Sequence, residues 1–522
     1  MRPFLALWIL LIVLASSGAA QVLQWGVWEK RFTGSSAATH LFLPARLRGP
    51  DGAAHPVDAF WDGGRDWVVR FSPDQAGKWR YEFGGQRGSF AVSAAPGPLT
   101  LKLSASRRYL VDANGSPFFW LADTAWNGAI QATGQEWSRY LADRKAKGFT
   151  GVQFVMTQWR AAPQAGAFTP GPPLRVNPEF FQRMDRRFAA IRDAGLVALP
   201  VLLWAIASKN SVDPGYSLPN DQAIRLARYL VARYGAYPLL WILGGDGDYR
   251  GEKAEKWKQI GRAVFPPGRA RRLVTMHPQG MQWPWEAFED ESWLDLLTYQ
   301  SGHSNNDRSR GWNVVELPAL AAKLRQIRPV INAEPNYETH LDYHDRLPIT
   351  DFQVRRAAYW SLLGHPPAGI TYGAHGIWFW SRKPEIPTAH ERSGVALPWF
   401  DSIHLPGAAQ MKILRDLFDS IEWWRLRPDS SLIADPPHDL SFRSHIGAAA
   451  SDVGDLALLY LPDNPEIEVR LDHLVRPIRA QWVDPRTGVR YEAGSLPNRG
   501  SRALSPPGQG DWLLLLDART GR

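Results

Sequence analysis

Two acidic residues, Asp246 and Glu334, each follow a short apolar run of the kind that forms a buried strand. Asp246 comes after residues 239–243 and two glycines, and Glu334 comes shortly after Val330 and Ile331. In barrels of parallel strands, the catalytic groups lie at the carboxyl ends of the strands. Two carboxyl groups flanking a glycosidic bond can protonate the leaving oxygen and attack the anomeric carbon or activate water. The spacing therefore predicts a carboxylate pair that hydrolyses glycosidic bonds.

Residues near this pair offer an alternative nucleophile, and two glycines support a sugar-binding role. Glu338 follows Glu334 by four residues and is the alternative nucleophile, although it lies further into the loop. Gly244 and Gly245 carry no side chain beside Asp246, so a sugar ring could approach the backbone there. We therefore expect Glu334 and Asp246 to face a common sugar-binding cleft.

Metal binding is the main competing interpretation of these residues. The segment 246–248 begins like a calcium loop, with Gly251 at the glycine position of that motif. Arg250 and Trp257 stand where oxygen ligands belong, which disfavours calcium. Several histidines lack the spacing of a zinc-binding helix motif and are expected to form hydrogen bonds instead: His277, His303, His340, His344 and His375. We expect no metal and no cofactor.

Aromatic and polar residues near the other strand ends are the expected lining of the cleft. The chain has 25 Trp, 22 Phe and 15 Tyr, more than a core alone requires, and spare aromatic rings commonly contact sugars. Asp123 is expected to bind sugar hydroxyl groups rather than to transfer a proton. The candidate substrate contacts, each weighed against a role in packing, are Asp123, Trp126, Gln158, Trp204, His277, Tyr299, Asn336, Tyr337, Tyr372 and Trp378.

The elements that would position these residues alternate along residues 99–427. Asn177 and Pro178 are typical of a helix start, and Gly195 is typical of its end. Eight alternations of strand and helix over about 310 residues predict a single (β/α)8 barrel of the α/β class. The expected strands are residues 118–121, 151–156, 196–203, 239–243, 273–276, 294–300, 330–331 and 369–372.

The barrel is flanked by two regions that have period-two hydrophobic patterns and frequent turn signals. Residues 21–98 and 428–522 contain no long amphipathic helix pattern, and each is predicted to form a β-sandwich. A chain of 522 residues is too long for one compact core, which agrees with three domains.

Residues 1–20 have the composition of a signal peptide. A basic start is followed by an apolar run over residues 4–14 and by small residues at 16–20, which predicts a mature chain that begins near Gln21. The run is shorter than the ~20 residues that span a bilayer, so no membrane anchor is expected after cleavage. The chain has no Cys, and a periplasmic or secreted location is expected.

Net charge does not indicate nucleic-acid binding. The chain has 60 basic and 51 acidic residues, and its densest basic cluster is only Arg269, Arg271 and Arg272. A nucleic-acid site would need a basic stripe with interleaved aromatic residues. The expected partner is a polysaccharide or an oligosaccharide, whereas the oligomeric state is not indicated.

The chain resembles the apiosidase-like glycoside hydrolases. These bacterial proteins pair a (β/α)8 barrel with β-sandwich domains, and residues 22–95 and 430–520 are similar to their flanking domains. The C-terminal one carries a collagen-binding label, yet nothing in residues 430–520 suggests a groove for a triple helix. The segments that carry the resemblance in the barrel are residues 118–126, 241–247, 330–338 and 369–378.

The resemblance implies a role for each carboxylate. Asp246, after the fourth strand, would be the acid/base, and Glu334, after the seventh, would be the nucleophile of a retaining mechanism. The broader clan of retaining barrel glycosidases usually has Asn-Glu after the fourth strand, where this chain has Gly245-Asp246. The shorter Asp leaves the stereochemical outcome open, and the sugar is not implied, because apiose release from pectic side chains is known for only part of the family.

The expected function is therefore hydrolysis of a plant or microbial polysaccharide. The alternative from another class is a non-catalytic glycan-binding or adhesion protein that keeps the barrel as a scaffold, since a fold alone does not give activity.

Overall fold

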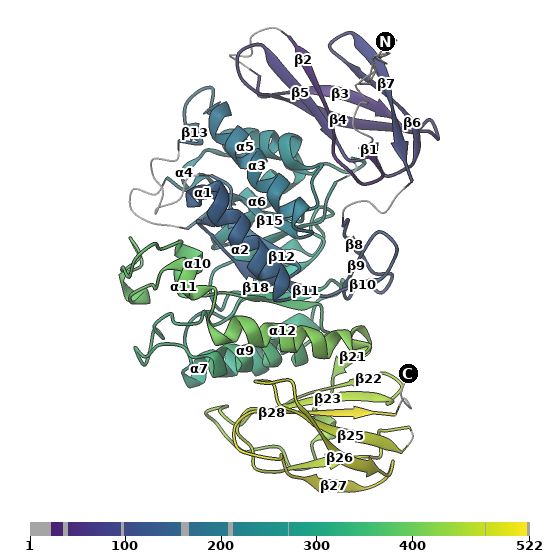
Figure 1. The fold of residues 1–522 in the computed structure, drawn as a ribbon, viewed down its shortest axis with the longest axis vertical. Coiled ribbons are helices and arrows are strands. Elements are labelled where there is room, and N and C mark those ends of the chain that lie inside the picture. The colour runs from purple at the N-terminus through teal and green to yellow at the C-terminus, as the bar shows by residue number, and fades with distance from the viewer. Residues whose placement is uncertain are drawn as a thin grey trace, which may run out of the picture.

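Three regions follow one another along the chain, with the barrel between two β-rich ends (Figure 1). The computed structural model describes residues 22–34, 40–94, 99–157, 166–206, 212–269, 271–475 and 477–518. The predicted signal peptide, residues 1–20, and the candidate contact Gln158 lie outside these ranges. Within them, no helix has both the length and the apolar character needed to cross a bilayer.

Eight parallel strands form the central sheet, in the order β17-β16-β15-β12-β11-β20-β19-β18. The two end strands are joined by hydrogen bonds that close the barrel. Asp295 N–H donates to Val274 O at 2.9 Å, and the Thr275 hydroxyl donates to Leu296 O at 2.8 Å. The strands are β11 (Trp120–Thr124), β12 (Gly151–Val155), β15 (Val197–Trp204), β16 (Trp241–Gly247), β17 (Val274–Pro278), β18 (Leu297–Gln300), β19 (Val330–Glu334) and β20 (Gly369–Tyr372).

The barrel prediction is confirmed, with two differences. Asp246 and Glu334 do not lie beyond their strands but within the last residues of β16 and β19. In addition, the described segment between β17 and β18 holds only a 3-10 turn, Trp285–Phe288, where a helix was expected. Pro278 at the end of β17, and Gly280 and Pro284 in the link, account for the missing helix, because proline removes a backbone donor and glycine disfavours helix.

The helices pack their apolar stripes against the strands. In α3 the apolar stripe, which includes Phe181, Met184 and Phe188, is buried. The Asn177 side chain accepts the backbone N–H of Glu179 at 3.1 Å, and it caps this helix as expected. The longer helices are α2 (Gly134–Ala146), α3 (Pro178–Asp193), α5 (Asn220–Tyr234), α6 (Lys253–Val264), α9 (Asp351–Leu363) and α12 (Pro406–Asp419). The shorter ones are α1 (Gly128–Gln131), α4 (Pro214–Ser217), α7 (Asp307–Gly311), α8 (Leu317–Ala322), α10 (His375–Phe379) and α11 (Trp399–Ser402).

The N-terminal region is a seven-stranded sheet that folds over on itself, in the order β1-β7-β6-β3-β4-β5-β2. Trp28 on one edge strand stacks on Phe90 of the strand next to the opposite edge, with ring centroids 4.2 Å apart. Such a contact needs the two ends of the sheet to face each other, which agrees with the predicted β-sandwich. The strands are β1 (Val22–Leu23), β2 (Trp28–Thr33), β3 (Phe42–Arg48), β4 (Ala54–Trp61), β5 (Asp66–Phe71), β6 (Gly77–Phe83) and β7 (Gln86–Ser93).

The C-terminal region consists of a six-stranded and a two-stranded antiparallel sheet around a separate apolar core. Arg355 of α9 forms a buried ion pair with Asp511, at 2.8 Å, that holds this region on the barrel. The strands are β21 (Leu426–Pro428), β22 (Gly447–Ser451), β23 (Leu456–Leu461), β24 (Ile467–Arg470), β25 (Ile478–Val483), β26 (Arg490–Leu496), β27 (Ser501–Leu504) and β28 (Trp512–Asp517). Small additional sheets are formed by β8 (Lys102–Leu103), β9 (Leu110–Val111) and β10 (Pro117–Phe118), and by β13 (Phe168–Thr169) and β14 (Arg175–Val176).

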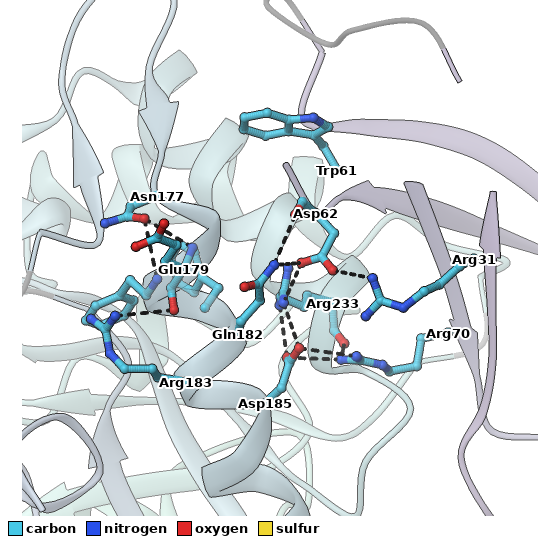
Figure 2. A network of polar contacts seen from close by, with 12 residues as sticks. Arg31, Trp61, Asp62, Arg70, Asn177, Glu179, Gln182, Arg183, Asp185 and Arg233 are labelled. Atoms are coloured by element: carbon cyan, nitrogen blue, oxygen red, sulfur yellow. Dashed lines mark hydrogen bonds and ion pairs between the residues drawn. The ribbon is translucent and has the colours of Figure 1, made fainter. Parts of the chain in front are cut away.

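A buried ion-pair network joins the N-terminal region to the barrel (Figure 2). Asp185 of α3 lies between two arginines, Arg70 of β5 at 3.2 Å and Arg233 of α5 at 2.6 Å. Both guanidinium groups are nearly inaccessible to solvent, so their charges depend on these carboxylates. Each arginine has one further acidic partner, Glu29 for Arg70 and Asp62 for Arg233.

We expect Asp185→Asn to lower the free energy of unfolding by about 2 kcal/mol, because two buried guanidinium groups lose a shared carboxylate. The loss of stability is smaller than for a fully unpaired buried charge, because Arg70 still pairs with Glu29 and Arg233 still pairs with Asp62. Urea unfolding measures the effect. The matched control is Asp193→Asn at the end of the same helix, where the carboxylate is 65% exposed and its loss should cost less than about 0.5 kcal/mol. Equal effects in both variants would contradict the prediction.

Candidate active site

A cavity of about 320 Å³ opens where the barrel strands end. Both predicted carboxylates, Asp246 and Glu334, belong to its wall, although they are 88 residues apart in the sequence. Gln300, the last residue of β18, and His303, just after it, line the space between them. The fold therefore brings the two acidic groups to one cavity at the carboxyl end of the sheet.

Glu334 is held by two histidines, one on each carboxylate oxygen. His277 Nε2 lies 3.0 Å from Oε2, and His303 Nε2 lies 3.0 Å from Oε1. Burial alone would raise the pKa of Glu334, but the two histidine hydrogen bonds outweigh it and hold this pKa well below its ordinary value. Glu334 is therefore ionised at any pH at which the protein would work, as a nucleophile requires.

The ionised state of Glu334 also fixes the tautomers of its partners. A carboxylate only accepts hydrogen bonds, so His277 and His303 must each carry a proton on Nε2. His277 is fully buried and packs edge to face against the ring of Trp126, with ring centroids 5.3 Å apart. The two imidazoles thus orient the carboxylate and present it to the cavity.

Asp246 is connected to Glu334 by a short chain of contacts. Gln300 Nε2 donates to Asp246 Oδ1 at 3.2 Å and lies 3.4 Å from His277 Nε2, which contacts Glu334. These contacts place the two carboxylates less than about 10 Å apart, a range that includes both the ~5–5.5 Å of retaining and the ~6.5–9.5 Å of inverting glycosidases. Asp246 has a left-handed backbone conformation, with φ +48°, that is uncommon outside glycine and is typical of functional sites.

The two glycines before Asp246 serve packing rather than substrate access. A Cβ on Gly245 would lie 2.4 Å from the Trp204 ring, and one on Gly244 would lie 2.6 Å from the Trp257 ring. We expected these glycines to open the backbone to a sugar. The structure instead shows that they make room for two tryptophan rings to pack against β16. Trp204 itself lines the cavity, so Gly245 contributes to its shape.

Four of the predicted aromatic contacts lie on the cavity wall together with the carboxylates. They are Trp126, Trp204, Tyr337 and Trp378. Trp126 and Trp204 contact each other, with ring centroids 4.9 Å apart, and form one continuous aromatic wall. His277 stands behind Glu334 and supports it from the barrel interior. These rings form the apolar part of the cavity wall.

Four other residues predicted as contacts do not line this wall. Tyr299 and Asp123 point outward from the barrel: the Tyr299 hydroxyl lies 3.5 Å from His365, and Asp123 accepts from Tyr140 of α2 at 2.7 Å. The reason is the two-residue alternation of a strand, which turns Tyr299 out where its neighbour Gln300 turns in. Burial raises the pKa of Asp123.

Tyr372 and Asn336 support the site from outside the cavity. The Tyr372 hydroxyl donates to Glu338 at 2.5 Å, and Gly407 N–H donates to the same carboxylate at 3.0 Å. Burial raises the pKa of Glu338, which lies away from the cavity wall, so the geometry disfavours it as the alternative nucleophile. Asn336 Nδ2 donates to Gly302 O at 2.9 Å and tethers the loop that carries His303.

The calcium alternative is not supported by the geometry around Asp246. Asp248 pairs with Arg250 at 2.9 Å and with Lys253 at 2.8 Å instead of turning toward Asp246. In the part of the chain that the structure describes, His, Cys, Asp and Glu residues form no group of three that could hold a metal ion.

Several wall residues were not predicted as contacts. Gln300 and Tyr343 lie on the wall, as do His340 and His390. Gln300 could have been predicted from the alternation of side chains along a strand. It ends the sixth strand two residues after Thr298, so the two side chains lie on the same, inward face. The others lie in long loops whose path depends on tertiary contacts, such as the Tyr343 N–H bond to His303 O at 3.0 Å.

We expect His303→Leu to move the acid limb of the kcat/KM profile to higher pH. The variant removes one of two donors that depress the pKa of Glu334, so this pKa rises toward its ordinary value and the carboxylate begins to protonate as the pH falls. Rates from about pH 3 to about pH 8 measure the shift. His404→Leu, which changes an exposed histidine outside the cavity wall, is the control, and an unmoved limb in His303→Leu would contradict the role of His303.

An eight-stranded parallel barrel with an ionised glutamate and an aspartate in one aromatic cavity is the arrangement of the glycoside hydrolases that use two carboxyl groups. Comparison with protein families agrees: residues 104–425 match the model described as "Apiosidase-like, catalytic domain". The chain belongs to this apiosidase-like family and is a glycoside hydrolase. The flanking regions match a domain of unknown function (DUF5060) over residues 21–84 and a domain named for collagen binding over residues 427–517.

Solved structures share the fold. A structure titled "Glycoside hydrolase" has a TM-score of 0.67 at 24% identity and covers 80% of this chain and 96% of its own. A glycoside hydrolase family 5 structure from Bacteroides vulgatus ATCC 8482 has a TM-score of 0.68 at 24% identity, with coverages of 80% and 93%. Another structure from that organism has a TM-score of 0.72 at 16% identity, with coverages of 95% and 99%. Comparison with curated proteins gives no match.

Proposed function

We propose that the protein cleaves glycosidic bonds of a plant or microbial polysaccharide by a retaining mechanism. Glu334 is the nucleophile and Asp246 is the acid/base. The observation that carries the proposal is the pair of histidines on Glu334, which keeps this carboxylate ionised while Asp246 faces the same cavity. A permanently ionised carboxylate suits attack on carbon and cannot serve as the proton donor.

Each step uses groups of the described cavity. In the first step, a Glu334 oxygen attacks the anomeric carbon, the bond to the leaving oxygen breaks, and Asp246 gives its proton to that oxygen. In the second step, Asp246 takes a proton from water, and the water oxygen displaces Glu334 from the anomeric carbon. Both carboxyl groups return to their starting states, and one water is consumed for each bond cleaved.

The remaining residues bind and orient the sugar. Trp126, Trp204 and Trp378 supply apolar faces for sugar rings, and Gln300 donates a hydrogen bond to Asp246. Family membership supports hydrolysis over the adhesion alternative. We further propose that the protein acts in the periplasm or outside the cell, on the basis of the signal-like composition of residues 1–20.

The test is hydrolysis of a panel of pectic, arabinan and bacterial polysaccharides, with reducing-sugar release as the measurement. The released sugar is then followed by NMR, because a retaining enzyme first gives the same anomer as the substrate and an inverting one gives the opposite anomer. Release that depends on Glu334 would support the proposal. Binding of the polysaccharides without any release, unchanged in Glu334→Gln, would overturn it in favour of a carbohydrate-binding role.

A further inference from the structure

A second hollow, of about 270 Å³, lies beside the catalytic cavity. Its walls are residues 305–308 and 310 after β18, residues 344–345 after β19, and Arg443 of the C-terminal region. The first two loops also reach the catalytic cavity, at Ser309 and at Tyr343. α7, in the first loop, lies on the side of the barrel that faces the C-terminal region (Figure 1).

A small polar pocket has wall residues in common with both spaces. It shares Ser301 and Ser304 with the catalytic cavity, and it shares Asn305 and Arg310 with the second hollow. A sugar chain with one unit in the catalytic cavity could therefore place a neighbouring unit over the second hollow. The hollow is thus positioned as an extension of the substrate site.

The wall of the hollow contains three arginines, of which only one is engaged by other described residues of the protein. Arg310 is occupied, because its guanidinium donates to Asp307 at 2.5 Å and to Ser441 O at 2.6 Å. Arg308 and Arg443 are both exposed, and among the described residues no hydrogen bond or ion pair engages either guanidinium. Of the two wall carboxylates, Asp307 is already paired with Arg310, and Asp345, which lies 3.6 Å from His344, offsets part of the positive charge.

The backbone that carries these two arginines is fixed rather than loose. Asp342 accepts Asn305 N–H at 2.7 Å and His344 N–H at 2.7 Å, so one carboxylate ties the two barrel loops together. In the C-terminal region, Asp439 accepts the N–H groups of Ser441 at 2.8 Å and Ser444 at 3.0 Å on either side of Arg443. A rigid backbone lowers the ordering cost of binding.

The C-terminal loop is also anchored to the barrel. Besides the bond between Arg310 and Ser441, Phe442 packs against Gly311, where an added Cβ would lie 2.7 Å from the Phe442 ring. Arg443 is therefore held at a defined place relative to Arg308 although the two belong to different regions of the chain.

We propose that this hollow is a subsite for an anionic group of the substrate, a carboxylate or a sulfate ester on a sugar next to the catalytic cavity, and that Arg308 and Arg443 bind it. The proposal rests on the function proposed above. Guanidinium groups match the oxygen geometry of such anions and form paired hydrogen bonds with them. The C-terminal region then takes part directly in substrate recognition, and the substrate is an acidic rather than a neutral glycan.

The test measures binding by calorimetry to the full chain carrying Glu334→Gln, so that no probe is consumed. The probes are an oligogalacturonate for the carboxylate, a carrageenan oligosaccharide for the sulfate, and a neutral galacto-oligosaccharide of similar length. We expect one of the two anionic probes to bind more tightly than the neutral one. Adding Arg308→Gln and Arg443→Gln should then weaken its binding by about tenfold, since each exposed charge pair contributes up to a few fold. Its salt dependence should decrease as well.

Two controls separate a specific effect from a general loss of charge. Arg502→Gln removes an exposed arginine of β27, which is outside the hollow, and should leave all three affinities unchanged. Arg308→Lys with Arg443→Lys keeps both charges but loses the paired donors, and should give an intermediate loss for the anionic probe. Binding of the neutral probe should be the same in the parent and in the double Gln variant.

The outcomes distinguish this inference from the proposed function. Equal affinity for neutral and anionic probes, or anion binding that survives the double Gln variant, would overturn the subsite even if hydrolysis depends on Glu334. Arginine-dependent anion binding in a protein that hydrolyses no polysaccharide of the panel would instead retain the subsite and overturn the hydrolytic proposal.

Discussion

Replacing Glu334 by Gln is expected to lower kcat/KM by about 10⁴-fold, equivalent to about 5 kcal/mol of activation free energy. The neutral amide cannot attack the anomeric carbon. It also replaces one accepting oxygen with a donor, which faces the N–H of either His277 or His303, each 3.0 Å from the native carboxylate. The variant should nevertheless bind substrate, because the aromatic wall is unchanged. Initial rates at saturating and at low substrate concentration measure the loss.

The control for this prediction is Glu338→Gln. Glu338 was the alternative nucleophile in the sequence, and it now lies outside the cavity, bonded to Tyr372 and Gly407. We expect its variant to keep kcat/KM within about tenfold of the parent, because only the support of the site is altered. A larger loss in Glu338→Gln than in Glu334→Gln would exchange the roles of the two carboxylates.

Chemical rescue gives an independent check on the nucleophile. In Glu334→Ala the missing carboxylate leaves space beside His277 and His303, and a small anion such as azide can occupy it. Azide attack on the anomeric carbon would give a glycosyl azide of inverted configuration, whereas the mechanism proposed for the parent enzyme retains the configuration. Absence of any azide product in Glu334→Ala, with full activity lost, would point to a role for Glu334 other than attack.

The barrel could be predicted from the sequence because its signals are local. Each strand is a short apolar run buried on both faces, and the helix that begins at Pro178 has a cap, a stripe and a glycine end in the right order. The link between β17 and β18 could not be predicted equally well. Its residues lack the periodic apolar pattern of an amphipathic helix, and a single 3-10 turn stands where a helix was expected.

The candidate site was only partly predictable because it depends on strand parity and on distant partners. Tyr299 and Gln300 are neighbours in the sequence, yet only Gln300 turns into the cavity. The histidines on Glu334 are 57 and 31 residues away from it, and nothing in the local pattern marks their contact. The position of each carboxylate at a strand end could be predicted, because the strand-end rule needs only the local sequence. The hydrogen bonds that set the pKa of Glu334 join distant segments and arise only in the folded barrel.

Replacing Asp246 by Ala is expected to lower the rate by an amount that depends on the leaving group. For a polysaccharide, whose leaving oxygen needs a proton, kcat/KM should fall by about 10³-fold, since positioned acid catalysis contributes about 10²–10⁴-fold. For an aryl glycoside with an acidic phenol, the glycosylation step needs little protonation and the loss should be much smaller. The comparison of the two substrates in one variant measures the effect.

The matched control is Asp248→Ala, two residues further along, where the carboxylate pairs with Arg250 and Lys253. Its loss removes a neighbouring carboxyl group without removing a group of the cavity wall, so both substrates should keep their rates. If Asp246→Ala slowed the polysaccharide and the aryl glycoside equally, Asp246 would act on substrate binding or on the position of Gln300, with which it shares a 3.2 Å hydrogen bond, and not as the acid. A loss confined to the poor leaving group would assign proton donation to Asp246, because only that step distinguishes the two substrates.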